Sequence, residues 1–246
     1  MYGPHGYNGK SLLLNTIEEV LEFYVQTMDK SVMLDSGVQK SGGNHSTELM
    51  QLENKRIGQL TDSKEGAVLN DATAKQVTSI TDKISAREIY GIQKEFVPVF
   101  VPFICTNFVI KMNLQDQAMY DRLLIFPFDL KFTDYPTEPY HRQNDSGLAD
   151  KLRKNKEGIL KWLVDACIFY NNNQEMKIPQ AMIDAKIAYN NLVNPYLDFR
   201  NEYFVVQEGE KIARNDVIDM FQKYKQDNML KIPPMEYKRE LDKVFK

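Results

Sequence analysis

The sequence begins with Met1-Tyr-Gly-Pro-His-Gly-Tyr-Asn-Gly-Lys-Ser11, and residues 12–25 continue with apolar side chains at helical spacing. A glycine-rich segment before a helix is typical of a phosphate-binding loop. Its glycines let successive backbone N–H groups face one anion, and the helix N-terminus adds a positive potential. In such a loop Lys10 reaches the terminal phosphates and the hydroxyl of Ser11 holds Mg²⁺. This stretch therefore predicts a nucleotide site.

The match to the strict pattern G-x-x-x-x-G-K-S/T is incomplete, because Pro4 stands where the first glycine is expected. Two arrangements stay open. Either Gly3 takes the role of that glycine in a loop one residue longer, or proline is tolerated at this place. The alternative interpretation of the whole stretch is an ordinary glycine-rich turn that caps a helix.

The composition indicates a globular protein. With 246 residues, of which 43% are hydrophobic, we expect one α/β domain and a smaller appendage. A net charge of −3 excludes a protein that coats nucleic acid with its whole surface, so DNA binding would require a local basic strip. No apolar run approaches the roughly 18 residues of a membrane span, and the N-terminus is no signal peptide, so we expect neither membrane association nor secretion.

The cysteine and histidine content also limits the class of protein. Cys105 and Cys167 both lie in apolar surroundings and are typical of buried thiols in an intracellular protein. Two cysteines and three scattered histidines make no convincing zinc site. Only Met1 and Tyr2 precede the loop, which normally follows a buried strand, so we expect a fragment or a late-starting reading frame that lacks at least its first strand and a larger N-terminal region.

A predicted strand over residues 55–60 is followed by Thr61-Asp-Ser-Lys-Glu-Gly66. A nucleotide hydrolase needs an acidic residue at such a strand end for the magnesium shell, and a neighbouring carboxylate to polarise the attacking water. Asp62 is the candidate on the metal side, and Glu65 is the candidate water activator. The alternative is that both are solvated turn residues.

A second polar residue follows a more strongly apolar strand. Residues 69–81 predict a helix, and residues 84–100 predict a β-hairpin with its turn at Gly91. The run 99–106 is nearly all apolar, as is typical of a central strand covered on both faces. It ends at Asn107, a position from which an amide can sense the γ-phosphate. An asparagine that merely caps the strand is the alternative.

Arg122 directly precedes a predicted strand over residues 122–128. An arginine that projects from the side of one subunit and meets a neighbour's phosphate acts as an arginine finger, whereas most surface arginines are only solvated. Residues 31–34 are strand-like. Helical segments begin at about residue 148, with a predicted strand over 204–206 among them, so the C-terminal region is expected to be a small helical or winged-helix domain.

Taken together, these features resemble the superfamily 3 helicases of the poxvirus and phage/plasmid primase-helicase type. The loop Gly6-Tyr-Asn-Gly-Lys-Ser11 is similar to that family's G-x-N-G-K-S loop, and the resemblance covers about residues 1–135 by motif. The other matching residues are Lys55-Arg56, Asp62 with Glu65-Gly66, Leu69-Asn70, Asp82-Lys-Ile-Ser-Ala-Arg87 with Tyr90, Glu95-Phe96 with Pro98, Asn107, and Arg122 with Phe126-Pro-Phe128.

The resemblance implies an α/β, AAA+-like P-loop NTPase core over residues 1–135, three-layered with a mainly parallel sheet and lacking its first strand. A mostly helical, winged-helix-like region follows over 136–246. The implied function is that of an ATP-dependent DNA helicase that uses ATP and Mg²⁺. It works as a ring, expected to be a hexamer, on single-stranded DNA in viral or phage/plasmid replication. A primase domain on the same chain and a cytoplasmic or viral replication site are further implications.

Carried over residue by residue, the resemblance gives the phosphate-binding role to Gly6, Asn8, Gly9, Lys10 and Ser11, with Ser11 and Asp62 at the metal. Asp62 stands at the Walker B acid, Asn107 at the sensor asparagine and Arg122 at the trans-acting arginine. The hairpin is the DNA-facing element, on which Lys83, Arg87 and Lys94 track phosphates and Tyr90 offers a stacking face.

Alternatives stay open beside this interpretation. The alternative for the hairpin is structural: Tyr90 simply packs, and Arg87 pairs with Glu88 or Glu95. For the whole chain, the alternative is a non-catalytic DNA-binding or assembly module derived from such a helicase. A P-loop kinase of small molecules is disfavoured, because the places of Asn107 and Arg122 suit a ring ATPase.

Overall fold

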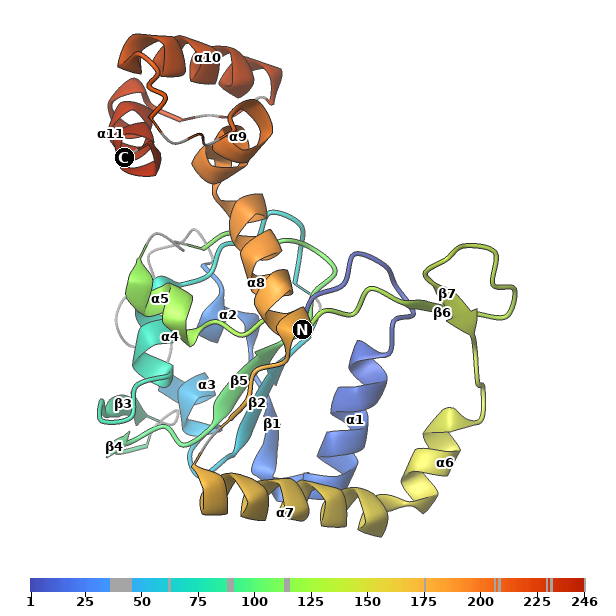
Figure 1. Cartoon of the computed structure of the whole chain (residues 1–246). Coiled ribbons are helices and arrows are strands. Elements are labelled where there is room, and N and C mark those ends of the chain that lie inside the picture. Colours follow the sequence, from blue (N-terminus) through green and yellow to red (C-terminus); the bar gives the residue numbers. More distant parts are fainter. Residues whose placement is uncertain are drawn as a thin grey trace. The chain divides into compact units, whose positions relative to one another are not determined.

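The computed structural model describes residues 1–35, 46–61, 63–87, 91–112, 116–174, 176–205, 207, 209–228, 230 and 232–245. The chain divides into two compact units, Met1–Lys186 and Ile187–Lys246. Each unit has a hydrophobic core of its own. The first is an α/β unit with a small parallel sheet, and the described part of the second is helical (Figure 1).

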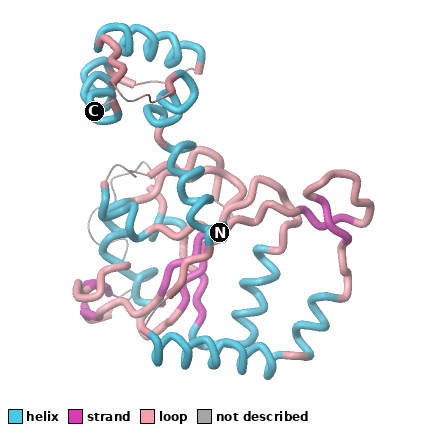
Figure 2. Tube along the Cα trace, in the orientation of Figure 1, coloured by secondary structure: helices cyan, strands magenta, loops and turns pink. Residues whose placement is uncertain are grey.

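The sheet of the first unit consists of β1 (Val25–Thr27), β2 (Ile57–Leu60) and β5 (Val101–Ile104), in the order β1-β2-β5. Both pairings are parallel, with Gly58 of β2 in register with Gln26 and Pro102. Parallel strands need long crossover connections, and short helices lie within both of them (Figure 2). The strands predicted over residues 55–60 and 99–106 are therefore confirmed, with shorter bounds.

The first residues of the chain extend this parallel pairing beyond β5. Tyr2 forms parallel bridges with Thr106 on one side and Pro127 on the other. The Tyr2 N–H donates to the carbonyl of Phe126 at 3.0 Å, and the Tyr2 carbonyl accepts from the N–H of Phe128 at 2.8 Å. The N-terminal segment therefore lies between the chain that leaves β5 and the segment around Pro127.

Helices cover both faces of the sheet. Since successive side chains of a strand point to opposite faces, one strand packs against both layers of helices. On β5, Phe103 packs against a cluster that contains Leu14 of α1 (Lys10–Leu21), whereas Ile104 packs against a larger cluster. The larger cluster includes buried side chains from the helices α2 (Lys30–Met33), α3 (Ser46–Met50), α4 (Asp71–Val77) and α5 (Gln117–Arg122). In Figure 1, α1 and these four helices lie on opposite sides of the strands.

Two smaller pairs of strands accompany the sheet. β3 (Ile84–Arg87) pairs antiparallel with β4 (Gln93–Phe96), which confirms the predicted hairpin. Its inward side chains, Ile84 and Ala86, are buried in the larger cluster. β6 (Lys131–Thr133) pairs with β7 (His141–Gln143). The helices α6 (Leu148–Lys154), α7 (Lys156–Asn173) and α8 (Gln180–Val193) follow.

The second unit contains α9 (Pro195–Tyr203), α10 (Arg214–Asp227) and α11 (Pro234–Val244). Asn194 caps α9, since its side chain accepts hydrogen bonds from two backbone N–H groups of the first turn. Phe199 and Phe221 are fully buried, and their rings meet edge to face at 5.1 Å between centroids. The core of this unit is therefore mainly aromatic.

Three predictions about short strands differ from the structure. Residues 31–34, predicted as a strand, belong mostly to α2, because Asp29 caps this helix by accepting from the Ser31 N–H at 2.8 Å. Arg122 ends α5, and the predicted strand 122–128 is reduced to the bridge at Pro127. Phe204 is the residue that caps the C-terminal end of α9. Of the predicted strand 204–206, the structure describes Phe204 and Val205, and neither belongs to a strand. The domain boundary expected near residue 135 stays a prediction.

Candidate functional site

The loop before α1 has the backbone geometry that its sequence suggests. Gly9, the residue that caps α1, has a left-handed φ of 87°, and its carbonyl accepts the first helical hydrogen bond from the Leu13 N–H at 3.0 Å. Glycine adopts this conformation without steric cost. Tyr7 has φ 56°, and its side chain is exposed. The free N–H groups of the first turn of α1 therefore follow directly on the loop.

Gly3 is the loop glycine with the least room for a side chain. A Cβ atom at this position would lie 2.2 Å from the Phe128 carbonyl oxygen and 2.6 Å from Nδ2 of Asn8. Asn8 is itself buried and donates from Nδ2 to the His5 carbonyl oxygen at 2.6 Å. Gly6, in contrast, has open space around the same position. In this loop, therefore, a glycine is sterically required at position 3.

Lys10 is the buried cation of the site. Its side chain has 5% relative exposure, and Nζ donates to Oδ1 of Asn107 at 2.6 Å and to the Gly3 carbonyl oxygen at 3.3 Å. Burial lowers the pKa of Lys10 below its ordinary value of 10.5. The structure thus brings together two of the residues predicted from the sequence, one from the loop and one from the end of a strand.

These residues line a cleft of about 340 Å³ at the carboxyl ends of the parallel segments. Residues 1–3 lie next to β5, and the chain continues from them to β1, at the far edge of the sheet. After β5 the chain continues in the other direction, to Pro127 on the opposite side of residues 1–3. The two connections therefore diverge between residues 1–3 and β5. Ligands of open α/β sheets bind at such switch points. The lining residues are Gly6, Tyr7, Asn8, Lys10, Ser11, Thr61, Ser63, Cys105, Thr106, Asn107 and Phe108.

Of the two acidic candidates, the structure describes only Glu65. Asp62 lies outside the described residues, although its neighbours Thr61 and Ser63 line the cleft. Glu65 is exposed and is not among the lining residues. No group of three or more His, Cys, Asp or Glu side chains that could hold a metal ion occurs in the part of the chain that the structure describes. Of the predicted metal ligands, only the Ser11 hydroxyl can therefore be placed, at the N-terminal turn of α1.

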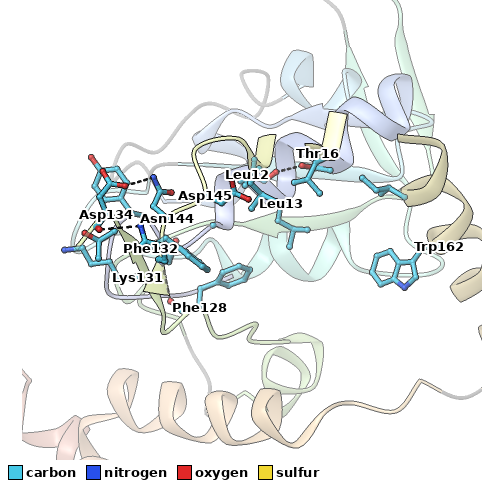
Figure 3. A pocket seen from close by; sticks show the side chains of 18 residues that line it. Leu12, Leu13, Thr16, Phe128, Lys131, Phe132, Asp134, Asn144, Asp145 and Trp162 are labelled. Carbon is cyan, nitrogen blue, oxygen red and sulfur yellow. Dashed lines mark hydrogen bonds between the residues drawn. The ribbon is translucent and has the colours of Figure 1, made fainter. Parts of the chain in front are cut away.

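A second, larger cavity of about 950 Å³ adjoins the loop, and Figure 3 shows side chains that line it. Tyr7 and Asn8 line both cavities, and the Tyr7 carbonyl accepts from the N–H of Phe132 at 2.8 Å, which ties β6 to the loop. The sequence did not predict this cavity. Its walls are mainly apolar and come from α1, β6, the segment before β6, α6 and α7. The apolar lining residues include Leu12, Leu13, Phe128, Phe132, Leu148, Leu152, Ile159 and Trp162.

The other predicted residues that the structure describes are not among those that line the cleft. Arg122 is exposed and donates to the Ala118 carbonyl of its own helix at 2.7 Å. On the hairpin, Arg87 and Lys94 are exposed, and Lys83 pairs with Glu95 at 3.7 Å. Tyr90, like Glu88, lies outside the described residues. The described cations of the hairpin are therefore open to solvent.

Sequence reasoning missed two hydroxyl residues of the cleft. Ser63 and Thr106 are buried, and Ser63 Oγ donates to Thr106 Oγ1 at 2.6 Å. The available signal was their position, since each adjoins a predicted site residue at the end of a strand. Serine and threonine are so common at strand ends that this signal is weak.

Comparison with known proteins connects this chain with viral proteins. No family model matches it. A protein of Acanthamoeba polyphaga mimivirus is 24% identical over 227 residues, which cover 88% of this chain and 23% of the relative. A protein of Frog virus 3 is 23% identical over 91% of this chain and 24% of its own length. A protein of Sputnik virophage is 22% identical over 88% of this chain and 29% of its own length.

Each of these three relatives bears the name "putative helicase". The chain spans about a quarter of the length of the curated relatives it matches. The α/β architecture with its parallel sheet is compatible with a P-loop NTPase-like fold. None of the helices within the described residues has both the length and the apolar character that crossing a membrane requires.

Proposed function

We propose that this chain is the ATPase part of a superfamily 3 DNA helicase, with an AAA+-like P-loop core, acting in viral or phage/plasmid-type DNA replication. The observation that carries the proposal is the contact of Lys10 with Asn107 in a cleft between a glycine-rich loop and a strand end. The names of the similar viral proteins support the helicase part of this proposal. A ring of subunits, expected to be a hexamer, and a primase domain on the parent chain belong to the proposal.

The triphosphate binds across the N-terminus of α1. Free backbone N–H groups of the first turn face the phosphates, and Lys10 exchanges its neutral oxygen partners for a phosphate oxygen. Mg²⁺ arrives with the nucleotide as part of the substrate complex, and the Ser11 hydroxyl is placed to bind it. Phosphates and one or two carboxylates usually complete the shell of this ion, and Asp62 is the candidate carboxylate.

The nucleoside lies in the larger, apolar cavity beside the loop. Tyr7 and Asn8 line both cavities, so a bound molecule can reach from one to the other past the loop. Phe132, whose ring approaches Gly9 and whose N–H bonds the loop, offers an apolar surface for a base. Apolar walls with a few polar groups are the usual lining of such pockets.

Hydrolysis requires groups beyond those that bind phosphate. Water attacks the γ-phosphorus in line, with Asp62 or Glu65 as the water-orienting carboxylate and Asn107 beside the terminal phosphate. Arg122 acts in trans, because in this chain it is exposed and away from the cleft. Contact with a neighbouring subunit's nucleotide would offset the charge that develops in the transition state.

Mixed oligomers test this arrangement. Lys10→Ala and Arg122→Ala proteins are each expected to have lost DNA-stimulated ATPase activity, measured with and without Mg²⁺ on the parent protein. A mixture of the two should regain activity, because an intact arginine then faces an intact cleft. Arg142→Ala, which removes another exposed arginine, is the matched control. A mixture that stays inactive, or an Arg122→Ala protein that is fully active, would contradict the proposal.

The DNA-binding part of the proposal rests on the hairpin. Single-stranded DNA passes along β3 and β4, where Arg87 and Lys94 are exposed. Removing one cation that contacts a phosphate should lower the slope of log affinity against log salt by about 0.7. We expect this change for Lys94→Ala and not for Lys30→Ala, an exposed lysine on α2. Equal slopes for both variants would remove the hairpin from the DNA path.

A second candidate function is a non-catalytic assembly or DNA-binding module. One observation favours it: the described residues that line the cleft include no carboxylate. A module of this kind binds ATP but leaves it intact. Parallel measurements of ATP binding and ATP turnover on the parent protein distinguish the two functions.

A further inference from the structure

Two buried hydroxyl groups connect the chain that leaves β2 with the chain that leaves β5. Ser63 Oγ donates to Thr106 Oγ1 at 2.6 Å, and each residue has 6% relative exposure. Thr106 Oγ1 also accepts from the Phe108 N–H at 2.9 Å and donates to the Phe108 carbonyl at 2.8 Å. A hydroxyl has one donor and two acceptor sites, so the Thr106 hydroxyl is fully used.

The backbone polar groups of Thr106 are hydrogen-bonded as well. Its N–H donates to the carbonyl of Met1 at 3.1 Å, and its carbonyl accepts from the N–H of Gly3 at 3.3 Å. Both residues next to Asn107 in the sequence are thus held: Thr106 by these bonds, and Phe108 because its N–H and its carbonyl both bond the Thr106 hydroxyl. This turn fixes the direction in which the Asn107 side chain leaves the backbone.

We propose that Ser63 and Thr106 are positioning residues, which hold the Asn107 amide beside Lys10 in the place where it distinguishes a terminal phosphate. This inference rests on the proposed nucleotide-binding function. Ser63 acts through Thr106, since its hydroxyl hydrogen is donated to Thr106 Oγ1. The loop after β2 is thereby coupled to the asparagine after β5.

The physical reason for such a device is preorganisation. A dipole that is fixed before the ligand arrives needs no reorganisation when charge must be stabilised. Without the Thr106 hydroxyl, the Phe108 N–H and the Ser63 hydroxyl would lose their partner, and the turn could relax. A displacement of about 1 Å in a positioned group can cost about 100-fold in rate.

The preference for ATP over ADP measures this positioning. Calorimetric titration of the whole chain with Mg²⁺–ATP and with Mg²⁺–ADP gives the ratio of the two affinities. Thr106→Val keeps the shape of the side chain but removes the hydroxyl, and we expect it to lower the ratio about tenfold, the loss of one charge-assisted hydrogen bond. Thr106→Ser restores the hydroxyl and should keep the wild-type ratio. Ser63→Ala should lower the ratio by a smaller factor.

A double variant separates positioning from general structural damage. Asn107→Ala lowers the ratio by itself, and adding Thr106→Val in this background should change it no further, because the group that Thr106 positions is already absent. Thermal unfolding of each variant shows that it is folded. If Thr106→Val does not fold, Ser63→Ala and its double variant with Asn107→Ala carry the same test.

Three results would overturn the inference: an unchanged ratio in Thr106→Val, an equal loss in Thr106→Ser, or a further loss when Thr106→Val is added to Asn107→Ala. A wild-type chain that binds neither nucleotide would give a different result. It would overturn the proposed function, and this inference with it.

Discussion

Nζ of Lys10 lies 2.6 Å from Oδ1 of Asn107, across a separation of 97 residues in the sequence. The lysine is buried, and its two hydrogen-bond partners in the described part of the chain are neutral oxygens, Oδ1 of Asn107 and the Gly3 carbonyl. A buried charge that lacks an opposite charge is costly. A phosphate bound in the cleft would supply that charge, which is why this pair is central to the proposed function.

The lowered pKa of Lys10 predicts how nucleotide affinity depends on pH. Burial disfavours the charged form in the free protein, whereas a bound phosphate favours it. Above the lowered pKa, binding must therefore take up a proton, and affinity falls as pH rises. We expect this fall to begin below pH 10.5, the ordinary value for lysine. Titrations from neutral to alkaline pH measure it, and Lys10→Arg, which keeps its proton throughout, is the control.

The two glycines at positions 3 and 6 should respond differently to alanine. At Gly3 a Cβ atom would lie 2.2 Å from a backbone oxygen, whereas at Gly6 no atom lies within 4 Å of it. Overpacking of this kind typically costs about 1–3 kcal/mol. We therefore expect Gly3→Ala to lower the free energy of unfolding by about this amount. Gly6→Ala should leave it nearly unchanged. Urea unfolding of both variants tests the difference, and equal stabilities would contradict the described loop geometry.

The apolar cavity predicts a selective effect of Phe132→Ala. If the base lies beside this ring, removing it should weaken ATP binding about tenfold, as expected for losing one aromatic stacking contact. Binding of inorganic triphosphate, which has no base, should stay the same. Phe169→Ala removes an exposed aromatic side chain that does not line the cavity and serves as the control. Equal losses for ATP and triphosphate would place the base elsewhere.

In the second unit, the buried hydroxyl of Tyr224 donates to Oδ2 of Asp198 at 2.6 Å. Tyr224→Phe should lower the free energy of unfolding by about 1.5–3 kcal/mol, the usual range for a hydrogen bond to a charged group. Burial raises the pKa of Tyr224 above its ordinary 10.0, so the unfolded chain loses this proton first. Stability should therefore decrease as pH rises past 10.0, and less so in Tyr224→Phe. An identical pH dependence of unfolding in both proteins would show that Tyr224 does not titrate in this way.

The sequence was sufficient for features whose local pattern agrees with the final fold. The glycine loop, the strand ending before Asn107 and the hairpin were all predicted, because glycine placement and apolar runs report directly on backbone geometry and burial. For residues 31–34 the strand prediction is wrong, because the apolar pattern of so short a segment also fits a helix and Asp29 caps one there. The pairing of Tyr2 with Thr106 and Pro127 was not foreseen, because one or two residues carry no periodic signal.

For the candidate site, the sequence suggested residues but not their arrangement. Lys10 and Asn107 were both named from the sequence, yet only the parallel pairing of residues 1–3 with the end of β5 brings them into contact. The hydroxyl pair and the apolar cavity depend on tertiary packing and leave no distinct mark in the sequence. The roles of Asp62 and Tyr90 stay predictions, because both residues lie outside the described part of the chain.

The central claim is that the cleft at Lys10 binds the phosphates of ATP. Calorimetric titration of the purified chain with Mg²⁺–ATP, compared with Lys10→Met, tests it most directly, because methionine fills a similar volume without the charge. The account predicts saturable binding by the wild-type protein and none by Lys10→Met, although thermal unfolding shows that the variant is folded. Wild-type protein that does not bind, or Lys10→Met protein that binds with equal affinity, would contradict it.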